Sequence, residues 1–144
     1  MAMPIHDTRV TSTDRIQPNQ ANNYQTAHGG EVVKLMDELA AVSAMGVAGE
    51  LCVTARIGSV NFRRPVPVGH VAETTAYVYD TGETSLEVQV TVESRPPTST
   101  DSEMTTSACF TMVAVDESGE PLPVPDVTVE DEEDRSLLSA ANCA

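Results

Sequence analysis

Three kinds of chemical group that could act on an acyl group lie close together near the start of the chain. They are an amide, a pair of glycines and a carboxylate, supplied by Asn22, Gly29, Gly30 and Asp37. A thioester carbonyl attacked by water becomes an oxyanion, and free N–H groups at a helix start can stabilise that charge. Glycines there let a substrate approach the backbone, and a carboxylate can act as general base or nucleophile. The spacing therefore predicts an acyl-transfer site.

Each of these groups also has a plainer explanation. A glycine pair often marks a tight turn that needs a positive φ. Asp37 could lie on a wet helix face and pair with Lys34, one turn before it. Asn22 could simply support a turn, and Asn23 beside it competes for the same role. The residues alone leave these alternatives open, and His28, with no evident acid partner beside it, is expected to shape the loop or to contact substrate.

The distance between two of these groups limits how they can cooperate. Gly29 and Asp37 are eight residues apart, which is ~12 Å along one helix. A single carbonyl cannot contact both, but a two-fold dimer with antiparallel central helices brings Asp37 of one subunit to Gly29 of the other. We therefore expect two equivalent sites at a dimer interface.

The apolar pattern predicts the elements that must position this site. One long helix is expected from Gly29-Gly30 to Gly46 and Gly49, because apolar residues recur at helical spacing between them. Strands are expected over Thr8–Ile16, Leu51–Phe62, Val71–Tyr79, Leu86–Val92 and Met104–Val115. A single apolar helix followed by antiparallel strands buries its faces only if the sheet wraps around it. The chain therefore predicts an α+β hot-dog fold with about five strands, in the order β-α-β-β-β-β.

Residues 1–116 are expected to form this domain, followed by an acidic tail over residues 117–144. Prolines at positions 121, 123 and 125 exclude a central strand there. The acidic run at 130–134 is expected to be solvated, with a short helix over residues 135–140. We expect no catalytic role for this tail.

Charge and composition exclude several classes of partner. The chain has 22 acidic and 8 basic residues and a net charge of −14, so neither a nucleic acid nor a membrane partner is expected. No apolar stretch approaches the ~20 residues needed to cross a membrane, and the start has no signal-peptide pattern. A cytoplasmic protein is expected, and its acidity favours a halophilic, salt-adapted cytoplasm. The three cysteines have no metal-site spacing, so no metal is expected.

Three blocks in register make the chain resemble the acyl-CoA thioesterases of the hot-dog superfamily, in the acyl-CoA hydrolase branch. The blocks are Asn22 with Gly29-Gly30 and Met36-Asp37, then residues 59–69, then residues 81–88. The resemblance covers residues 8–115. It implies hydrolysis of an acyl-CoA to free acid and CoA, without a metal or other cofactor, by homodimers or homohexamers that are trimers of dimers.

The resemblance also implies roles for individual residues. Asp37 would be the base or nucleophile, Asn22 its positioning partner, and Gly29 or Gly30 the oxyanion donor, with the asparagine and the carboxylate supplied by different subunits. Relatives usually have a glycine three residues after the asparagine, where this chain has Gln25. The loop is therefore expected to differ in shape.

The phosphates of CoA require positive charge in an acidic protein. Arg63-Arg64 is the only adjacent basic pair, and the planar guanidinium of arginine suits phosphate. We expect at least one of the two to contact phosphate, although a surface pair balancing nearby acids is the simpler alternative. Gly82, Thr84 and Ser85 are expected to line the pantetheine or nucleotide path.

Two other functions compete with hydrolysis. A hot-dog hydratase or dehydratase would use a histidine with an acid in a characteristic helix-start motif, which His28 does not provide. A sensor that binds acyl-CoA without turnover would have no use for a base beside the thioester, so Asn22 and Asp37 together argue against it. The acyl group, and the choice between dimer and hexamer, stay open.

Overall fold

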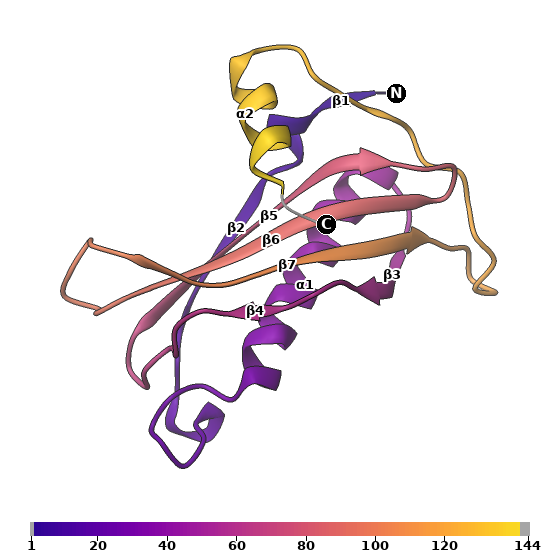
Figure 1. The fold of residues 1–144 in the computed structure, drawn as a ribbon. Coiled ribbons are helices and arrows are strands. Elements are labelled where there is room, and N and C mark those ends of the chain that lie inside the picture. The colour runs from indigo at the N-terminus through magenta and orange to yellow at the C-terminus, as the bar shows by residue number, and fades with distance from the viewer. Residues whose placement is uncertain (1, 142–144) are drawn as a thin grey trace.

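The computed structural model of the protein describes residues 2–141, and its centre is one long helix against an antiparallel sheet. The helix is α1 (Gly29–Ala48). The strands are β2 (Val10–Arg15), β3 (Cys52–Ile57), β4 (Asn61–Phe62), β5 (Val71–Thr81), β6 (Ser85–Arg95) and β7 (Glu103–Ala114). The sheet has the order β2-β5-β6-β7-β3, and β4 also pairs with β7. Because α1 lies across one face of this sheet, the predicted hot-dog fold is confirmed (Figure 1).

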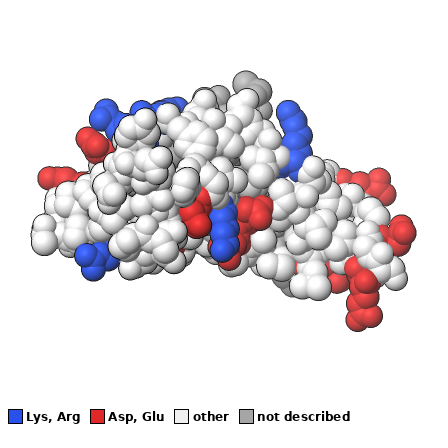
Figure 2. Space-filling view, turned by 90° about the horizontal axis from the view of Figure 1, so that it is seen from below, with Lys and Arg blue, Asp and Glu red and all other residues white. Residues whose placement is uncertain are grey.

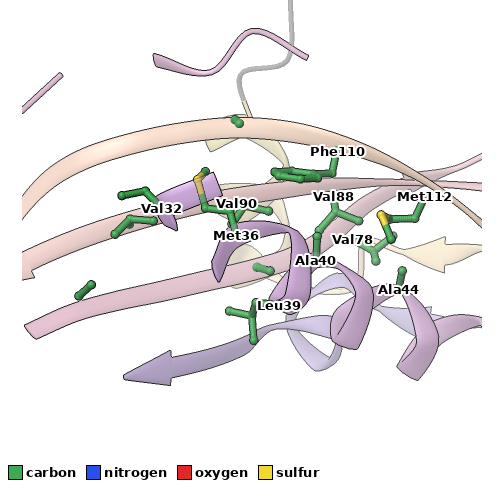
Figure 3. Close-up of a cluster of buried hydrophobic side chains, with 14 of the residues drawn as sticks. Val32, Met36, Leu39, Ala40, Ala44, Val78, Val88, Val90, Phe110 and Met112 are labelled. Carbon is green, nitrogen blue, oxygen red and sulfur yellow. The ribbon is translucent and has the colours of Figure 1, made fainter. Parts of the chain in front are cut away.

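The core lies between α1 and the inner face of the sheet. One side of α1 is buried, and it packs on alternate residues of β5, β6 and β7 (Figure 3). The labelled residues of this core are Val32, Met36, Leu39, Ala40, Ala44, Val78, Val88, Val90, Phe110 and Met112. Gly49, with φ of 68°, ends the helix as predicted. Gly46 does not end it, because the next turn buries Val47, which offsets the cost of about 1 kcal/mol for a glycine inside a helix.

Two predicted strands contain irregularities that matter for the site. The predicted strand over residues 51–62 is divided into β3 and β4 at Gly58, where an added Cβ would lie 3.3 Å from the carbonyl oxygen of Cys109. β3 also has a bulge at Ala55, and β7 has one at Thr105. Bulges of this kind turn side chains away from the regular alternation.

The C-terminal segment contains the predicted short helix, which begins three residues earlier than expected, at Glu132. The small elements around it are β1 (Met3–Pro4), η1 (Ile5–Thr8), η2 (Pro18–Gln20), β8 (Val127–Thr128) and α2 (Glu132–Ala140). α2 lies on the opposite face of the sheet from α1 (Figure 1), and the hydroxyl of Tyr77 donates to the carbonyl of Leu137 at 2.6 Å. Residues 142–144 of the predicted tail lie outside the described residues. None of the described helices is both long and apolar enough to cross a membrane.

The acidic run was expected to be solvated, but one of its residues is completely buried. Asp134 is 0% exposed, and its carboxylate accepts hydrogen bonds from the N–H groups of His6 at 2.7 Å and Glu130 at 2.8 Å. The ring Nδ1 of His6 lies 2.8 Å from the same carboxylate. A buried carboxylate is tolerated when it is paired and hydrogen-bonded in this way, so α2 is fixed to the start of the chain.

The charges of this contact depend on pH in opposite directions. The hydrogen bond to Asp134, with added attraction from Asp7 and Asp131, raises the pKa of His6 above 6.5. Burial opposes the charge of Asp134, but the hydrogen bonds from Glu130 and His6 outweigh it and lower its pKa below 3.8. The stabilisation from His6 is complete below 6.5 and is lost as pH rises through its raised pKa. The stabilisation from Asp134 is complete above 3.8 and is lost as pH falls through its lowered pKa.

We therefore expect Asp134→Asn to lower the melting temperature by several degrees at pH 5 to 6, because the charged pair is complete there. The difference from the unmodified protein should shrink as pH rises towards 9 and His6 loses its proton. Melting curves across this pH range measure both effects. Asp101→Asn, at an exposed position, is the control, and a constant difference across the pH range would contradict the assignment.

Candidate active site

A cavity of about 310 Å³ lies at the start of α1. Its lining includes Asn22, Gly29, Val32, Arg63, Arg64 and Thr106. The structure therefore brings together four of the residues predicted for the site, from the loop before α1, the first turn of α1 and the segment after β4. Asp37, His28, Gly30 and the predicted residues at 82, 84 and 85 do not line it.

The side chain of Asn22 is held in one orientation. Its carbonyl oxygen accepts hydrogen bonds from the N–H groups of Tyr24 at 2.9 Å and Thr26 at 3.2 Å, and from the Thr26 hydroxyl at 3.1 Å. Because this oxygen already has three donors, the group left for a substrate is the NH₂, which can only donate. Asn23, the competing amide, is exposed and does not line the cavity.

The loop around Asn22 contains the only non-glycine residue with a positive φ among residues 2–141. This residue is Gln25, with φ of 61°. It stands where the family resemblance led us to expect a glycine, and its backbone has the left-handed conformation that glycine adopts without strain. Left-handed backbone costs a residue with a Cβ roughly 1–2 kcal/mol.

The glycine pair opens α1 without needing special backbone angles. Neither Gly29 nor Gly30 has a positive φ, so the tight-turn explanation does not apply. Their N–H groups find no acceptor among the described residues, as is usual in a first helical turn. A Cβ on Gly30 would have no atom within 4 Å, and one on Gly29 would lie 3.4 Å from the ring of Phe62. Space for a side chain is therefore open at Gly30, whereas at Gly29 it is bounded by the Phe62 ring.

Asp37 lies half-buried on α1, outside the cavity of its own subunit. Its Oδ1 accepts a hydrogen bond from the hydroxyl of Thr54 on β3. Lys34 forms no ion pair in the described part of the chain. The alternative in which Asp37 lies on a solvent-exposed helix face and pairs with Lys34 therefore finds no support. Sequence reasoning missed Thr54, because threonine is common in strands and no spacing links positions 37 and 54. The bulge at Ala55 follows it directly.

The remaining predicted residues lie elsewhere. His28 is the exposed residue that precedes α1, and its N–H donates to the carbonyl of Gln20 at 2.9 Å. Gly82, Thr84 and Ser85 form the turn between β5 and β6. A Cβ on Gly82 would lie 2.6 Å from the Ser85 hydroxyl, so a side chain there would require Ser85 to change rotamer.

That turn lies near the opposite end of α1 from the cavity. The N–H of Ala114 donates to the carbonyl of Thr84, and the next residue, Val115, donates to Leu51, which follows the end of α1. Within one subunit the turn therefore does not contribute to the cavity.

The two arginines are positioned by their backbones. The N–H groups of Arg63 and Arg64 both donate to the carbonyl of Thr105, at 2.8 and 3.3 Å. Both side chains are exposed. Arg64 lies 3.8 Å from Glu103, whereas the guanidinium of Arg63 has no carboxylate partner within residues 2–141.

β3 forms one edge of the sheet and is open to solvent. Val53 and Ile57 are 50% and 41% exposed on it, and no described strand pairs with its outer edge. Seen from below the view of Figure 1, most of the visible surface has no charged side chain (Figure 2). An open edge with exposed apolar residues is a template for another strand.

The described residues contain one group that could hold a metal ion. It consists of His6, Asp131 and Glu133, whose ligand atoms lie within 4.8 Å of one another. None of them lines the cavity at the start of α1. The donors in that cavity are amides, guanidinium groups and hydroxyls, which suit an anionic or carbonyl-bearing ligand.

Comparisons with known proteins identify the family of this chain. The model of the thioesterase superfamily matches residues 24–100. An uncharacterized acyl-CoA thioester hydrolase, YkhA of Bacillus subtilis, is 33% identical over 135 residues, which are 94% of this chain and 78% of that protein.

Solved structures give the same result. A hexameric acyl-CoA thioesterase without ligand is 40% identical, with a TM-score of 0.90 over 98% of this chain and 90% of that one. An acyl-CoA hydrolase from Staphylococcus aureus, in complex with butyryl-CoA, CoA and CoA disulfide, is 28% identical, with a TM-score of 0.89 over 98% and 86%. Three variants of that enzyme have alanine in place of an asparagine, an aspartate or a threonine, and these positions are separated by 15 and 17 residues.

Proposed function

Since this chain belongs to the thioesterase superfamily, we propose that it hydrolyses acyl-CoA at sites shared between two subunits. The observation that carries the proposal is the division of the chemical groups. Asn22 and Gly29, which both carry free donors, line one cavity, whereas Asp37 lies outside it, beside the open strand β3. Within the described part of one subunit the cavity lacks a carboxylate, and Asp37 lacks donors that could bind the thioester; a second subunit would supply both.

The donors would stabilise the oxyanion. The thioester carbonyl would receive hydrogen bonds from the NH₂ of Asn22 and from the free N–H groups at the start of α1. These donors are fixed before substrate arrives, and the helix dipole adds to their effect on negative charge. Because the carbonyl oxygen of Asn22 is already occupied, Asn22 would bind the substrate oxygen rather than accept a proton from water.

Asp37 would act as general base towards the attacking water. Water attacks the thioester carbon while Asp37 takes its proton, and collapse of the intermediate releases the CoA thiolate, which is then protonated. Thr54 would hold one carboxylate oxygen and leave the other for the water. Asn22, Asp37 and Thr54 are separated by 15 and 17 residues, as are the three residue types replaced in the S. aureus enzyme. This agreement supports the assignment.

The open edge of β3 would supply the second subunit. If β3 pairs with its copy about a two-fold axis, the two α1 helices run antiparallel and Asp37 approaches the partner's cavity. The exposed side chains of Val53 and Ile57 would be covered in that pairing. A hexameric relative makes a trimer of such dimers the expected assembly.

Arg63 would bind a phosphate of CoA. We expect Arg63→Ala to raise KM about tenfold with little change in kcat, because it removes a charge-assisted hydrogen bond at an exposed position. The effect should shrink in molar KCl, where the Debye length is about 3 Å. Steady-state kinetics at low and high salt measure it.

Arg135→Ala is the matched control, because Arg135 is an exposed arginine on α2 that pairs with Glu132 at 2.8 Å. It should leave KM unchanged. Arg64 already faces Glu103, so Arg64→Ala should raise KM less than Arg63→Ala. An unchanged KM in both cavity variants would move the phosphate site elsewhere.

Thiol release tests the proposed function directly. A panel from acetyl-CoA to palmitoyl-CoA, with one aromatic thioester, would be assayed in molar KCl, which also tests the proposed salt adaptation. We expect hydrolysis of at least one member without added metal. Absence of thiol release from every member, with the protein folded and oligomeric, would overturn the proposal.

A further inference from the structure

We propose that the cavity at the start of α1 takes a short acyl chain that carries a hydroxyl group, and that Thr106 recognises this hydroxyl. The inference rests on the proposed function and adds the substrate class. It is carried by the bulge in β7, by the burial of Thr106 and by the size of the cavity.

The bulge breaks the alternation of β7 at the cavity. In the ladder with β6, Thr106 pairs with Val92 and Met104 with Glu93, so Thr105 is the extra residue. Both threonines are only 1% exposed, although neighbours in a regular strand point to opposite faces. The carbonyl of Thr105 also holds the backbone of Arg63 and Arg64. One irregularity therefore positions the arginines and brings Thr106 into the cavity wall.

The hydroxyl of Thr106 is weakly satisfied. It donates to the Thr105 hydroxyl at 3.5 Å, at the limit of a hydrogen bond, while the Thr105 hydroxyl donates to the carbonyl of Val92 at 3.1 Å. Apolar residues form another part of the same cavity wall, Val32 and Val66 among them. The oxygen of Thr106 is thus a buried polar atom with unused hydrogen-bonding capacity in an apolar cavity, the arrangement that selects a polar atom in a ligand.

The cavity is small. Its volume of about 310 Å³ is at the lower end of the range for ligand pockets, about 300–1,000 Å³. One turn further along α1, Met36 is fully buried, and so is Val92 beside Thr106 on the sheet. This packed core limits the depth of the cavity within one subunit, which favours a short acyl chain over a long fatty chain.

The expected discrimination follows from the hydrogen bond. A plain butyryl chain leaves the Thr106 hydroxyl facing methylene groups, whereas a hydroxybutyryl chain can exchange a hydrogen bond with it. We expect kcat/KM to be about tenfold higher for the favoured hydroxybutyryl-CoA than for butyryl-CoA, the factor for one net hydrogen bond. The factor is modest because Thr106 keeps its weak hydrogen bond to Thr105 when butyryl-CoA is bound. Sites whose buried polar groups have no other partner prefer the hydroxylated substrate by much larger factors.

The experiment compares butyryl-CoA with 2-, 3- and 4-hydroxybutyryl-CoA. The unmodified enzyme should favour one of the three over butyryl-CoA, and Thr106→Val, which keeps the shape but not the hydroxyl, should reduce that ratio to about one. Thr106→Ser should retain the preference. Thr111→Val makes the same change on the same strand, where the hydroxyl binds Glu87, and should leave the ratio unchanged.

The outcomes separate this inference from the proposed function. Equal hydrolysis of butyryl-CoA and all three hydroxyacyl-CoAs would overturn the inference and leave the thioesterase proposal intact. A preference that survives in Thr106→Val would also overturn it. No hydrolysis of any thioester, in this set or in the wider panel, would instead overturn the proposed function.

Discussion

Replacing Asp37 by asparagine should lower kcat about a thousandfold, within the range for loss of a general base. Asparagine keeps the shape and can still accept the hydrogen bond from Thr54, so the fold, the assembly and KM should change little. What disappears is the capacity to take a proton from water. Steady-state kinetics with the best substrate of the panel, together with a melting curve, measure these effects.

Glu38→Gln is the control for this experiment. Glu38 is the next residue on α1 and is exposed, so its replacement removes an equal charge from the same turn. Its kcat should stay within about twofold of the unmodified enzyme, as for most surface substitutions. If Asp37→Asn also kept near-full activity, another group would have to be the base.

Two inactive variants should restore each other when they form mixed dimers. Asn22→Ala removes the oxyanion donor and Asp37→Asn the base, so each homodimer should have well under a hundredth of full activity. A mixed dimer has one site with both replacements and one with neither. Its activity should therefore recover to about half of the unmodified value.

Differently tagged subunits, expressed together and purified by both tags, make this measurement possible. The control pairs Asp37→Asn with a chain that carries both replacements, which leaves no intact site and should show no recovery. If Asn22 and Asp37 acted within one subunit, the mixed dimers would stay as inactive as their parents. The result would then exclude the shared site while leaving the reaction itself open.

Much of the fold could be predicted from apolar spacing. α1 begins at the predicted glycine pair and ends at Gly49, β5 and β6 extend the predicted strands by a few residues, and β7 begins and ends one residue earlier than predicted. These elements bury one regular face, and such a face leaves a periodic pattern in the sequence. The division of residues 51–62 was not predicted, because it depends on a close approach between Gly58 and the neighbouring strand.

The site was predictable only in part, because its contacts join distant positions. The cavity contains the predicted residues Asn22, Gly29, Arg63 and Arg64, but neither the Thr54–Asp37 hydrogen bond nor the bulge at Thr105 has a local signal. The burial of Asp134 also has no local signal, because it depends on hydrogen bonds to His6 at the other end of the chain. The partners lie 17 residues apart for Asp37 and Thr54 and 128 apart for His6 and Asp134, and the bulge at Thr105 depends on its pairing with another strand.

The open edge of β3 affects the folded subunit in the interval between its synthesis and its assembly with a partner. A subunit that has folded but not yet met its partner exposes unpaired backbone groups and the apolar side chains of Val53 and Ile57, the conditions that favour sticking to the wrong neighbour. In the shared-site arrangement that same subunit is also without catalytic power. Formation of the correct dimer would thus cover the aggregation-prone edge and complete the active site in the same step. Acyl-CoA would be hydrolysed only by correctly assembled protein.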